Sequence, residues 1–144
     1  MKIQIVEDSE QKRTILEKCD KDFPRPLTNR EEYEDIFSKI DKYAVFLAAY
    51  DGEEAVGYAA IYINDAATNT GYISALCLMK EEQGQHIGSA LMRSCLELAA
   101  EKGMTCIRLE VLNTNAKAIR FYEHWGFEYE KICSGESAYY VKKL

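Results

Sequence analysis

One stretch of this chain combines residue types that can bind an anion. Residues 82–89 form a polar turn with glycines at Gly84 and Gly88, and the turn lies between the apolar run 72–79 and the amphipathic run 87–98. A strand, a turn and a helix in this order bring free backbone N–H groups and the positive end of a helix dipole to one point. Glycine allows close approach of a ligand to the backbone. The spacing therefore predicts a site for phosphate oxygens.

A second stretch carries a side chain that can give up a proton. Residues 115–127 begin with Asn115, contain Tyr122 and close on Gly126 and Phe127, which places the tyrosine on a later helix. Together the two stretches resemble the Q/R-x-x-G-x-G/A and N-x-x-A-x-x-(F/L)-Y-x-x-x-G-F signatures of the GNAT superfamily of acyl-CoA-dependent N-acetyltransferases. The P-loop and dinucleotide-binding glycine motifs are absent from the sequence, which disfavours a nucleotide-binding domain.

The resemblance implies that acetyl-CoA is the acyl donor, that CoA is the product, and that no metal takes part. It implies that the CoA diphosphate lies on the backbone of the turn, while the pantetheine arm pairs with the preceding strand. The residues implied to bind the cofactor are Leu76, Cys77, Leu78, Gln83, Gly84, Gln85, His86, Ile87, Gly88, Ser89, Asn115, Ala118 and Tyr122.

Two positions of the turn depart from the commonest family pattern. Gln83 stands where arginine is frequent, so one possible cation is absent, and His86 stands where glycine is usual. If that position requires a positive φ, histidine stores backbone strain there, although it tolerates this region better than most residues. A cationic imidazole would instead add charge next to the phosphates. The sequence leaves both interpretations of His86 open.

Attack of an amine on a thioester forms an oxyanion and expels a thiolate. By resemblance, Tyr122 is the hydrogen-bond and proton donor to the leaving sulfur, and backbone N–H groups of residues 76–78 face the oxyanion. A thiol pKa of about 8.5 and a tyrosine pKa of about 10 differ by about 1.5 units, so full proton transfer costs roughly 2 kcal/mol. A shifting hydrogen bond from Tyr122 is therefore feasible. The alternative is that Tyr122 packs in the core, as we expect for Phe121 and Trp125.

Two further residues lie on strands near the implied site. Glu110 stands in the register where relatives that resemble N-terminal protein acetyltransferases carry a catalytic base; its alternative is a strand glutamate that faces solvent. A base helps because an amine with a pKa of about 10.4 is only about one part in 10³ neutral at pH 7. For Cys77, strand alternation predicts a packing role, and the family chemistry is direct transfer in a ternary complex without an acyl-cysteine.

The acceptor is expected to be a primary amine of a small molecule. The family builds its acceptor groove from the first two helices, which here offer an acidic lip that suits a cation: Glu31, Glu32, Glu34 and Asp35, with Tyr33 and Phe37 interleaved. A solvated helix face explains the same charges. The rival acceptors are a protein N-terminus or a lysine, and the rival to an enzyme is a catalytically idle CoA-binding domain.

Apolar periodicity predicts the elements that position these groups. Strands are expected at residues 3–6, 44–50, 55–63, 71–79, 105–112, 127–133 and 138–142, and helices at 9–19, after 28–29, at 87–102 and at 115–126. This β-α-α-β-β-β-α-β-α-β-β order predicts an α/β protein with a mixed sheet and helices on both faces. The resemblance implies one GNAT domain over residues 1–144, with a mostly antiparallel sheet of about six to seven strands.

Particular residues are expected to begin and end these elements. Ser9, then Thr28 or Asn29, and Asn115 are candidate N-caps. Asp51-Gly52 marks a hairpin, and Gly103 ends the helix whose buried stripe is Ile87, Leu91, Cys95 and Leu98.

Composition constrains the partners and the cellular compartment that can be expected for the protein. The 144 residues carry a net charge of −6, which disfavours nucleic acid as a partner. No apolar run approaches the roughly 20 residues that span a bilayer, and no signal peptide is recognised. The five cysteines form no C-x-x-C pair, which favours reduced thiols and the cytoplasm. The apolar segment 138–141 permits a homodimer through the last strands.

Overall fold

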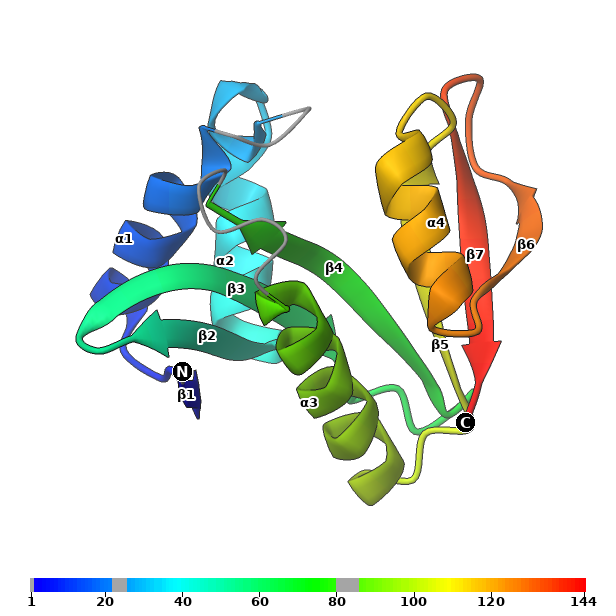
Figure 1. The fold of residues 1–144 in the computed structure, drawn as a ribbon, viewed down its shortest axis with the longest axis horizontal. Coiled ribbons are helices and arrows are strands. Elements are labelled where there is room, and N and C mark those ends of the chain that lie inside the picture. Colours follow the sequence, from blue (N-terminus) through cyan, green and yellow to red (C-terminus); the bar gives the residue numbers. More distant parts are fainter. Residues whose placement is uncertain (1, 22–25, 80–85) are drawn as a thin grey trace.

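The computed structural model describes residues 2–21, 26–79 and 86–144 (Figure 1). Its elements in chain order are β1 (Lys2–Ile5), α1 (Ser9–Asp20), a 3₁₀ turn (Leu27–Asn29), α2 (Tyr33–Tyr43), β2 (Val45–Asp51), β3 (Glu54–Tyr62), β4 (Thr70–Leu78), α3 (Ile87–Glu101), β5 (Cys106–Leu112), α4 (Ala116–His124), β6 (Glu128–Ile132) and β7 (Ser137–Lys143). This order is the one that the sequence predicted.

The described strands form a seven-stranded sheet in the order β1-β2-β3-β4-β5-β7-β6. Neighbouring strands run antiparallel except β4 and β5, which run parallel. Gly52 has a φ of 65° at the turn between β2 and β3, a conformation that glycine adopts without strain. The mixed, mostly antiparallel sheet is thus confirmed.

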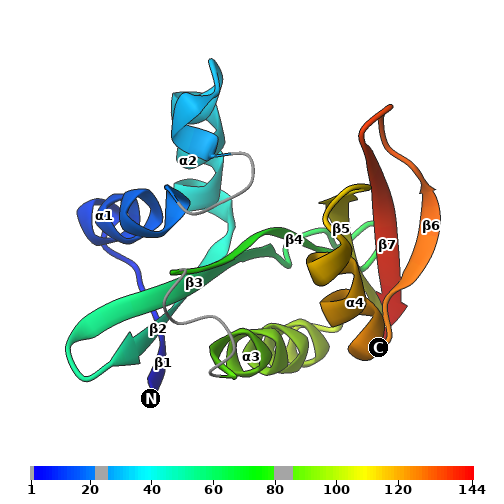
Figure 2. The same cartoon turned by 45° about the horizontal axis from the view of Figure 1, so that its top comes forward.

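The sheet separates two hydrophobic clusters. On one face, α1 and α2 pack over β2, β3 and β4, where the rings of Phe46 and Tyr58 stack with centroids 5.0 Å apart. On the other face, α3 and α4 share a cluster with β2 to β5 and β7. Figure 2 shows α1 and α2 on the side of the sheet opposite α3. Among the described residues, the α1–α2 cluster includes no side chain of β5, β6 or β7, so Arg108 and Glu110 are not covered by it.

Two predicted helix caps are wrong. The N-cap of α1 is Asp8, whose carboxylate accepts from the backbone N–H of Gln11, while the Ser9 hydroxyl donates to Asp41 of α2 at 2.7 Å. Thr28 does not cap α2, because its backbone N–H and its hydroxyl both donate to the buried carboxylate of Asp20. The chain therefore makes a 3₁₀ turn first, and α2 begins only at Tyr33.

The central helix α3 follows its predicted stripe with one change. Ile87, Leu91 and Cys95 are buried, but Leu98 is only half-buried. Met92 and Ala99 are buried beside the stripe, because α3 contacts both the sheet and the cluster shared with α4. Gly103 follows the helix with a φ of 81°, as expected for a glycine stop. Within the described residues, no helix is both long and apolar enough to cross a membrane.

The last strands differ from the expectation for a dimer. β7 lies between β5 and β6, so the apolar segment 138–141 is inside the sheet, and Ala138 and Tyr140 are buried. The strand at the edge of the described sheet is β6 instead. Sequence periodicity could not reveal this, because the place of β7 between β5 and β6 is set by topology rather than by either strand's own pattern.

Candidate active site

The two parallel strands of the sheet pair over only part of their length. The β4–β5 ladder runs from Thr70 opposite Cys106 to Ile73 opposite Leu109, and no pairing follows it in the described residues. At the same point β4 carries a bulge. Ala75 and Ile73 pair with two consecutive residues of β3, so Ser74 between them has no partner on that strand. Beyond the bulge the two strands diverge, as Figure 1 shows. We call the region where they part, residues 74–78 and 110–112, the β4–β5 opening.

The opening exposes an edge of β4 that can pair with an extended ligand. The predicted oxyanion segment, Leu76 to Leu78, forms this edge. Leu76 and Leu78 pack toward α3, whereas Cys77 is buried on the opposite face and donates its thiol hydrogen to the carbonyl of Cys19 at 3.2 Å. The packing role that alternation predicted for Cys77 is confirmed.

The end of β4, the start of α3 and the face of α4 meet at Gly88. A Cβ atom placed on Gly88 would lie 3.4 Å from the Leu78 side chain and 3.5 Å from the Phe121 ring. Ile87 and Gly88 are buried and Ser89 is half-buried. The predicted phosphate-binding residues Gln83, Gly84 and Gln85 lie outside the described residues.

His86 occupies the N-cap position of α3 in the left-handed region. Its φ is 64° and its ψ is 12°, and its exposed side chain makes no capping hydrogen bond. The positive φ that the family glycine suggested is therefore present. The His86 side chain therefore does not cap the first-turn N–H groups of α3, and N–H groups at a helix start are the kind of donor that binds an anion.

Tyr122 lies on the face of α4 that packs against α3. Its ring contacts Phe121 and Phe127 edge to face, with centroids 5.5 and 5.8 Å away, and it is partly buried. Burial, and after it the nearby thiols of Cys95 and Cys77, raises the pKa of Tyr122 to about 12. The phenol therefore stays protonated across the physiological pH range and can act as a donor.

Asn115 begins α4, as the sequence predicted. Its side-chain oxygen accepts a hydrogen bond from the backbone N–H of Ala118 at 3.2 Å. This bond satisfies one of the free N–H groups at the helix start. The cofactor contacts expected of Asn115 and Ala118 stay a prediction.

Glu110 is the first residue of β5 beyond the paired ladder, so it lies where the opening begins. Its side chain is exposed, and the hydroxyl of Ser137 on β7 donates to its Oε2 atom. Tyr139 lies directly opposite Glu110 in the β5–β7 register. Burial, and after it the charge of Glu110, raises the pKa of Tyr72, which shows that Tyr72 lies near this carboxylate.

Sequence reasoning missed Tyr72, Ser137 and Tyr139 as neighbours of Glu110. Each is an ordinary strand residue in the sequence, and only the register across β4, β5 and β7 brings them together. The nearby Arg108 is already paired with Glu130, through contacts of 2.8 and 3.0 Å. Its positive charge is thus partly neutralised beside Glu110.

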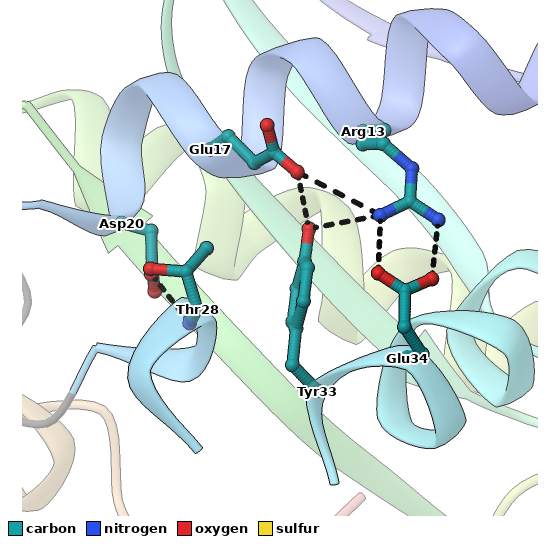
Figure 3. A network of polar contacts seen from close by, with 6 residues as sticks. All are labelled: Arg13, Glu17, Asp20, Thr28, Tyr33 and Glu34. Carbon is teal, nitrogen blue, oxygen red and sulfur yellow. Dashed lines mark hydrogen bonds and ion pairs between the residues drawn. The ribbon is translucent and has the colours of Figure 1, made fainter. Parts of the chain in front are cut away.

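The acidic lip expected on the first helices is less acidic than its sequence suggested. Glu34 forms a bidentate pair with Arg13 of α1, at 3.0 and 2.9 Å, and the Tyr33 hydroxyl donates to Glu17 at 2.7 Å (Figure 3). Phe37 is largely buried, and it lines a pocket between α1 and α2 together with Arg13 and Glu34. Glu31, Glu32 and Asp35 remain exposed. Because Arg13 comes from another helix, the sequence of α2 alone could not reveal this pairing.

Comparisons with a family model and with known proteins all identify acetyltransferases. The chain matches the acetyltransferase (GNAT) family over residues 12–127. It is similar to thialysine N-epsilon-acetyltransferase from Mus musculus, with 35% identity over 78 residues that cover 52% of this chain and 45% of that protein. It is also similar to N-alpha-acetyltransferase 30 from Schizosaccharomyces pombe, with 35% identity over 82 residues that cover 55% of this chain and 54% of that protein. The chain spans about half the length of these curated relatives.

The fold is shared with solved structures. PaiA N-acetyltransferase from Thermoplasma acidophilum, in complex with coenzyme A, superposes with a TM-score of 0.80 over 100% of both chains. The sequence identity of that pair is 23%, so this likeness establishes the fold.

Proposed function

Because the chain belongs to the acetyltransferase (GNAT) family, we propose that it moves an acetyl group from acetyl-CoA to a primary amine by direct attack in a ternary complex. The convergence of three elements at Gly88 carries this proposal. The end of β4, the start of α3 and the ring of Phe121 on α4 adjoin there, since a Cβ atom on Gly88 would contact both Leu78 and Phe121. The same place would receive the diphosphate, the pantetheine arm and the thioester.

The residues fit acetyl-CoA, which supplies an activated thioester acyl group when it is bound. The backbone of residues 76–78 would pair with the pantetheine arm, and N–H groups around Ile87, Gly88 and Ser89 would hold the diphosphate together with the turn before them. His86 itself is left-handed, and its side chain makes no capping hydrogen bond to α3. With a net charge of −6, the protein holds a polyanion through these local donors rather than through its overall field.

Tyr122 would stabilise the leaving sulfur. With its pKa at about 12, the phenol is less acidic than the sequence suggested. The gap from a thiol pKa of about 8.5 is about 3.5 units, so complete transfer of the proton would cost about 5 kcal/mol. Tyr122 therefore acts as a hydrogen-bond donor to the thiolate while negative charge develops, and solvent completes the protonation of CoA.

Glu110 would accept the proton of the amine. As the amine nitrogen attacks the carbonyl carbon, its N–H proton passes to the carboxylate, the C–S bond breaks, and the oxyanion is held by backbone N–H groups of residues 76–78. The exposure of Glu110 and its place at the β4–β5 opening support this role.

The acceptor in this proposal is a small cationic amine that enters beside Glu110. Tyr72 and Tyr139 offer rings next to the carboxylate, and a carboxylate with aromatic neighbours favours a cation. A protein N-terminus or lysine is the second candidate, because one similar protein is named as a putative [ribosomal protein bS18]-alanine N-acetyltransferase.

A panel of amines tests the proposal. The purified protein is mixed with acetyl-CoA and with polyamines, amino acids, aminoglycosides or peptides, and free thiol and acetylated product are measured. We expect amine-dependent thiol release that is strongest with small diamines. A preference for peptides would favour the second acceptor class, and CoA binding without amine-dependent thiol release would identify a catalytically idle domain.

Two further properties belong to this proposal. The edge strand β6 exposes Tyr129 at 57% and Ile132 at 70%, which supports a homodimer through this edge. Light scattering of the wild type and of Ile132→Glu measures it: a monomeric wild type contradicts the dimer. The five cysteines form no disulfide in the described structure, which supports a cytoplasmic location that fractionation of the native cells would test.

A further inference from the structure

Ser137 is a buried polar residue whose side chain is directed to the proposed base. Its exposure is 1%, although it begins β7 beside a hairpin of exposed residues. A buried hydroxyl is stable only if it is hydrogen-bonded. The Ser137 hydroxyl donates this hydrogen bond to Glu110 on the neighbouring strand β5. Glu110 lies two residues before Leu112, which is directly opposite Ser137 in the β5–β7 register.

The direction of the hydrogen bonds around Ser137 follows from the chemistry of the groups. An ionised carboxylate can only accept, so the single hydroxyl hydrogen of Ser137 goes to Glu110 Oε2. The hydroxyl of Ser134, 3.1 Å away, must then donate to Ser137. The backbone N–H of Glu136 donates to Ser134 in turn, at 3.2 Å. These donors form one chain that ends at Glu110 Oε2.

The hairpin holds Ser137 in place for this contact. The backbone N–H groups of Cys133 and Ser134 both donate to the Ser137 carbonyl, at 3.0 and 3.2 Å. The hydroxyl is therefore fixed on a rigid turn, whereas the Glu110 side chain is exposed and would otherwise sample several rotamers. Within the part of the chain that the structure describes, Glu110 Oε2 is held and Oε1 receives no hydrogen bond.

We infer that Ser137 is a positioning residue, which fixes one oxygen of Glu110 so that Oε1 takes the proton of the acceptor amine. This inference rests on the proposed role of Glu110 as the base. Ser137 touches neither acetyl-CoA nor the amine in this account. It acts by holding the carboxylate in one orientation, and Ser134 supports it by supplying the next donor.

A double-mutant cycle tests the inference. Ser137→Ala should lower kcat/KM for the amine by about tenfold, a part of the 10²–10⁴-fold that a general base supplies, and should leave the KM for acetyl-CoA unchanged. In a Glu110→Gln background the same substitution should have no further effect, because the group through which it acts is gone. Ser134→Ala should give a smaller loss of about twofold, since Ser137 can still donate.

Two variants separate the hydrogen bond from packing. Ser137→Cys keeps nearly the same volume but donates weakly, so it should resemble Ser137→Ala, whereas Ser137→Thr keeps the hydroxyl and should restore the rate to within about threefold. Thermal unfolding of each variant checks that it is folded at the assay temperature.

The outcomes distinguish this inference from the proposed function. A tenfold loss that persists in the Glu110→Gln background, or a wild-type rate in Ser137→Ala when Glu110→Gln is slow, overturns the positioning role alone. A wild-type rate in Glu110→Gln overturns the positioning role of Ser137 and also the role of Glu110 as the base. Acetyl transfer from acetyl-CoA to an amine would still stand.

Discussion

Tyr122 is the proposed hydrogen-bond donor, and burial raises its pKa to about 12. An acid must be protonated to act, so a raised pKa extends its working range to higher pH. The amine must lose its proton, and so the rate should rise from pH 6 to about 10 as the neutral fraction grows. We expect no falling limb before about pH 11, whereas an unperturbed tyrosine would give one near pH 10. The profile of kcat/KM for the amine against pH measures this, and a falling limb at or below pH 9.5 contradicts the assignment.

Cys77 lies near the proposed site, but its thiol takes no part in the proposed acetyl transfer. It is buried against α1 and donates to the Cys19 carbonyl. Cys77→Ala should therefore keep kcat within about threefold of wild type, while the free energy of unfolding falls by about 1–2 kcal/mol through lost packing. Steady-state kinetics and denaturant unfolding measure the two effects. A folded but inactive variant would instead indicate an acyl-cysteine intermediate.

Gly57 determines how closely β3 lies against the end of β4. A Cβ atom there would meet the Leu78 side chain at 2.8 Å and the Cys77 carbonyl at 3.0 Å. Gly57→Ala should therefore displace the edge of β4, lower the free energy of unfolding by about 1–3 kcal/mol and weaken acetyl-CoA binding. Gly135→Ala is the matched control, since a Cβ atom at Gly135 meets nothing within 4 Å. Equal CoA affinity in the two variants, measured by calorimetry, would show that this edge does not bind the cofactor.

The start of α3 stores backbone strain at His86, whose φ is 64°. His86→Gly should raise the free energy of unfolding by up to about 1 kcal/mol, because relief of roughly 1–2 kcal/mol of left-handed strain exceeds the entropy that glycine adds to the unfolded chain. His86→Ala removes the same imidazole but keeps the strain, so it should show no such gain. CoA affinity should stay within about threefold in both variants. A marked loss of affinity in both would show that a cationic imidazole contacts the phosphates.

Elements could be predicted from the sequence, but the contacts between them could not. Period-2 and period-3.6 patterns are local, so the hairpin at Gly52, the cap at Asn115 and the order of the elements were predicted correctly. Register and topology depend on distant pairings, and they put Ser137 beside Glu110 and β7 inside the sheet. The wrong caps at Ser9 and Thr28 have the same cause, because both hydroxyls have partners on other elements.

Only those residues of the candidate site that belong to a family sequence motif could be predicted from the sequence. Tyr122 and the glycine turn belong to spaced motifs, whereas Tyr72, Ser137 and Tyr139 have no signature of their own. The raised pKa of Tyr122 was also beyond the sequence, since it results mainly from burial between α3 and α4. Physical properties of a motif residue depend on the whole packing around it.

In the whole molecule, the proposed donor Tyr122 and the proposed base Glu110 come from different parts of the fold. Tyr122 comes from the face covered by α3 and α4, while Glu110 lies where the α1–α2 cluster leaves the sheet uncovered. An acyl donor along the β4 edge and an amine beside Glu110 could therefore approach one carbonyl carbon from different sides. This arrangement requires no covalent enzyme intermediate, in agreement with the packed state of Cys77.

Amine-dependent release of free CoA thiol by wild type and Tyr122→Phe tests this account most directly. Phenylalanine preserves the ring contacts with Phe121 and Phe127 and removes only the hydroxyl. We predict that the wild type releases thiol only when an acceptor amine is present, and that Tyr122→Phe lowers kcat by about 10²–10⁴-fold with nearly unchanged acetyl-CoA binding. Equal turnover by the two proteins, or no amine-dependent release by the wild type, would contradict it.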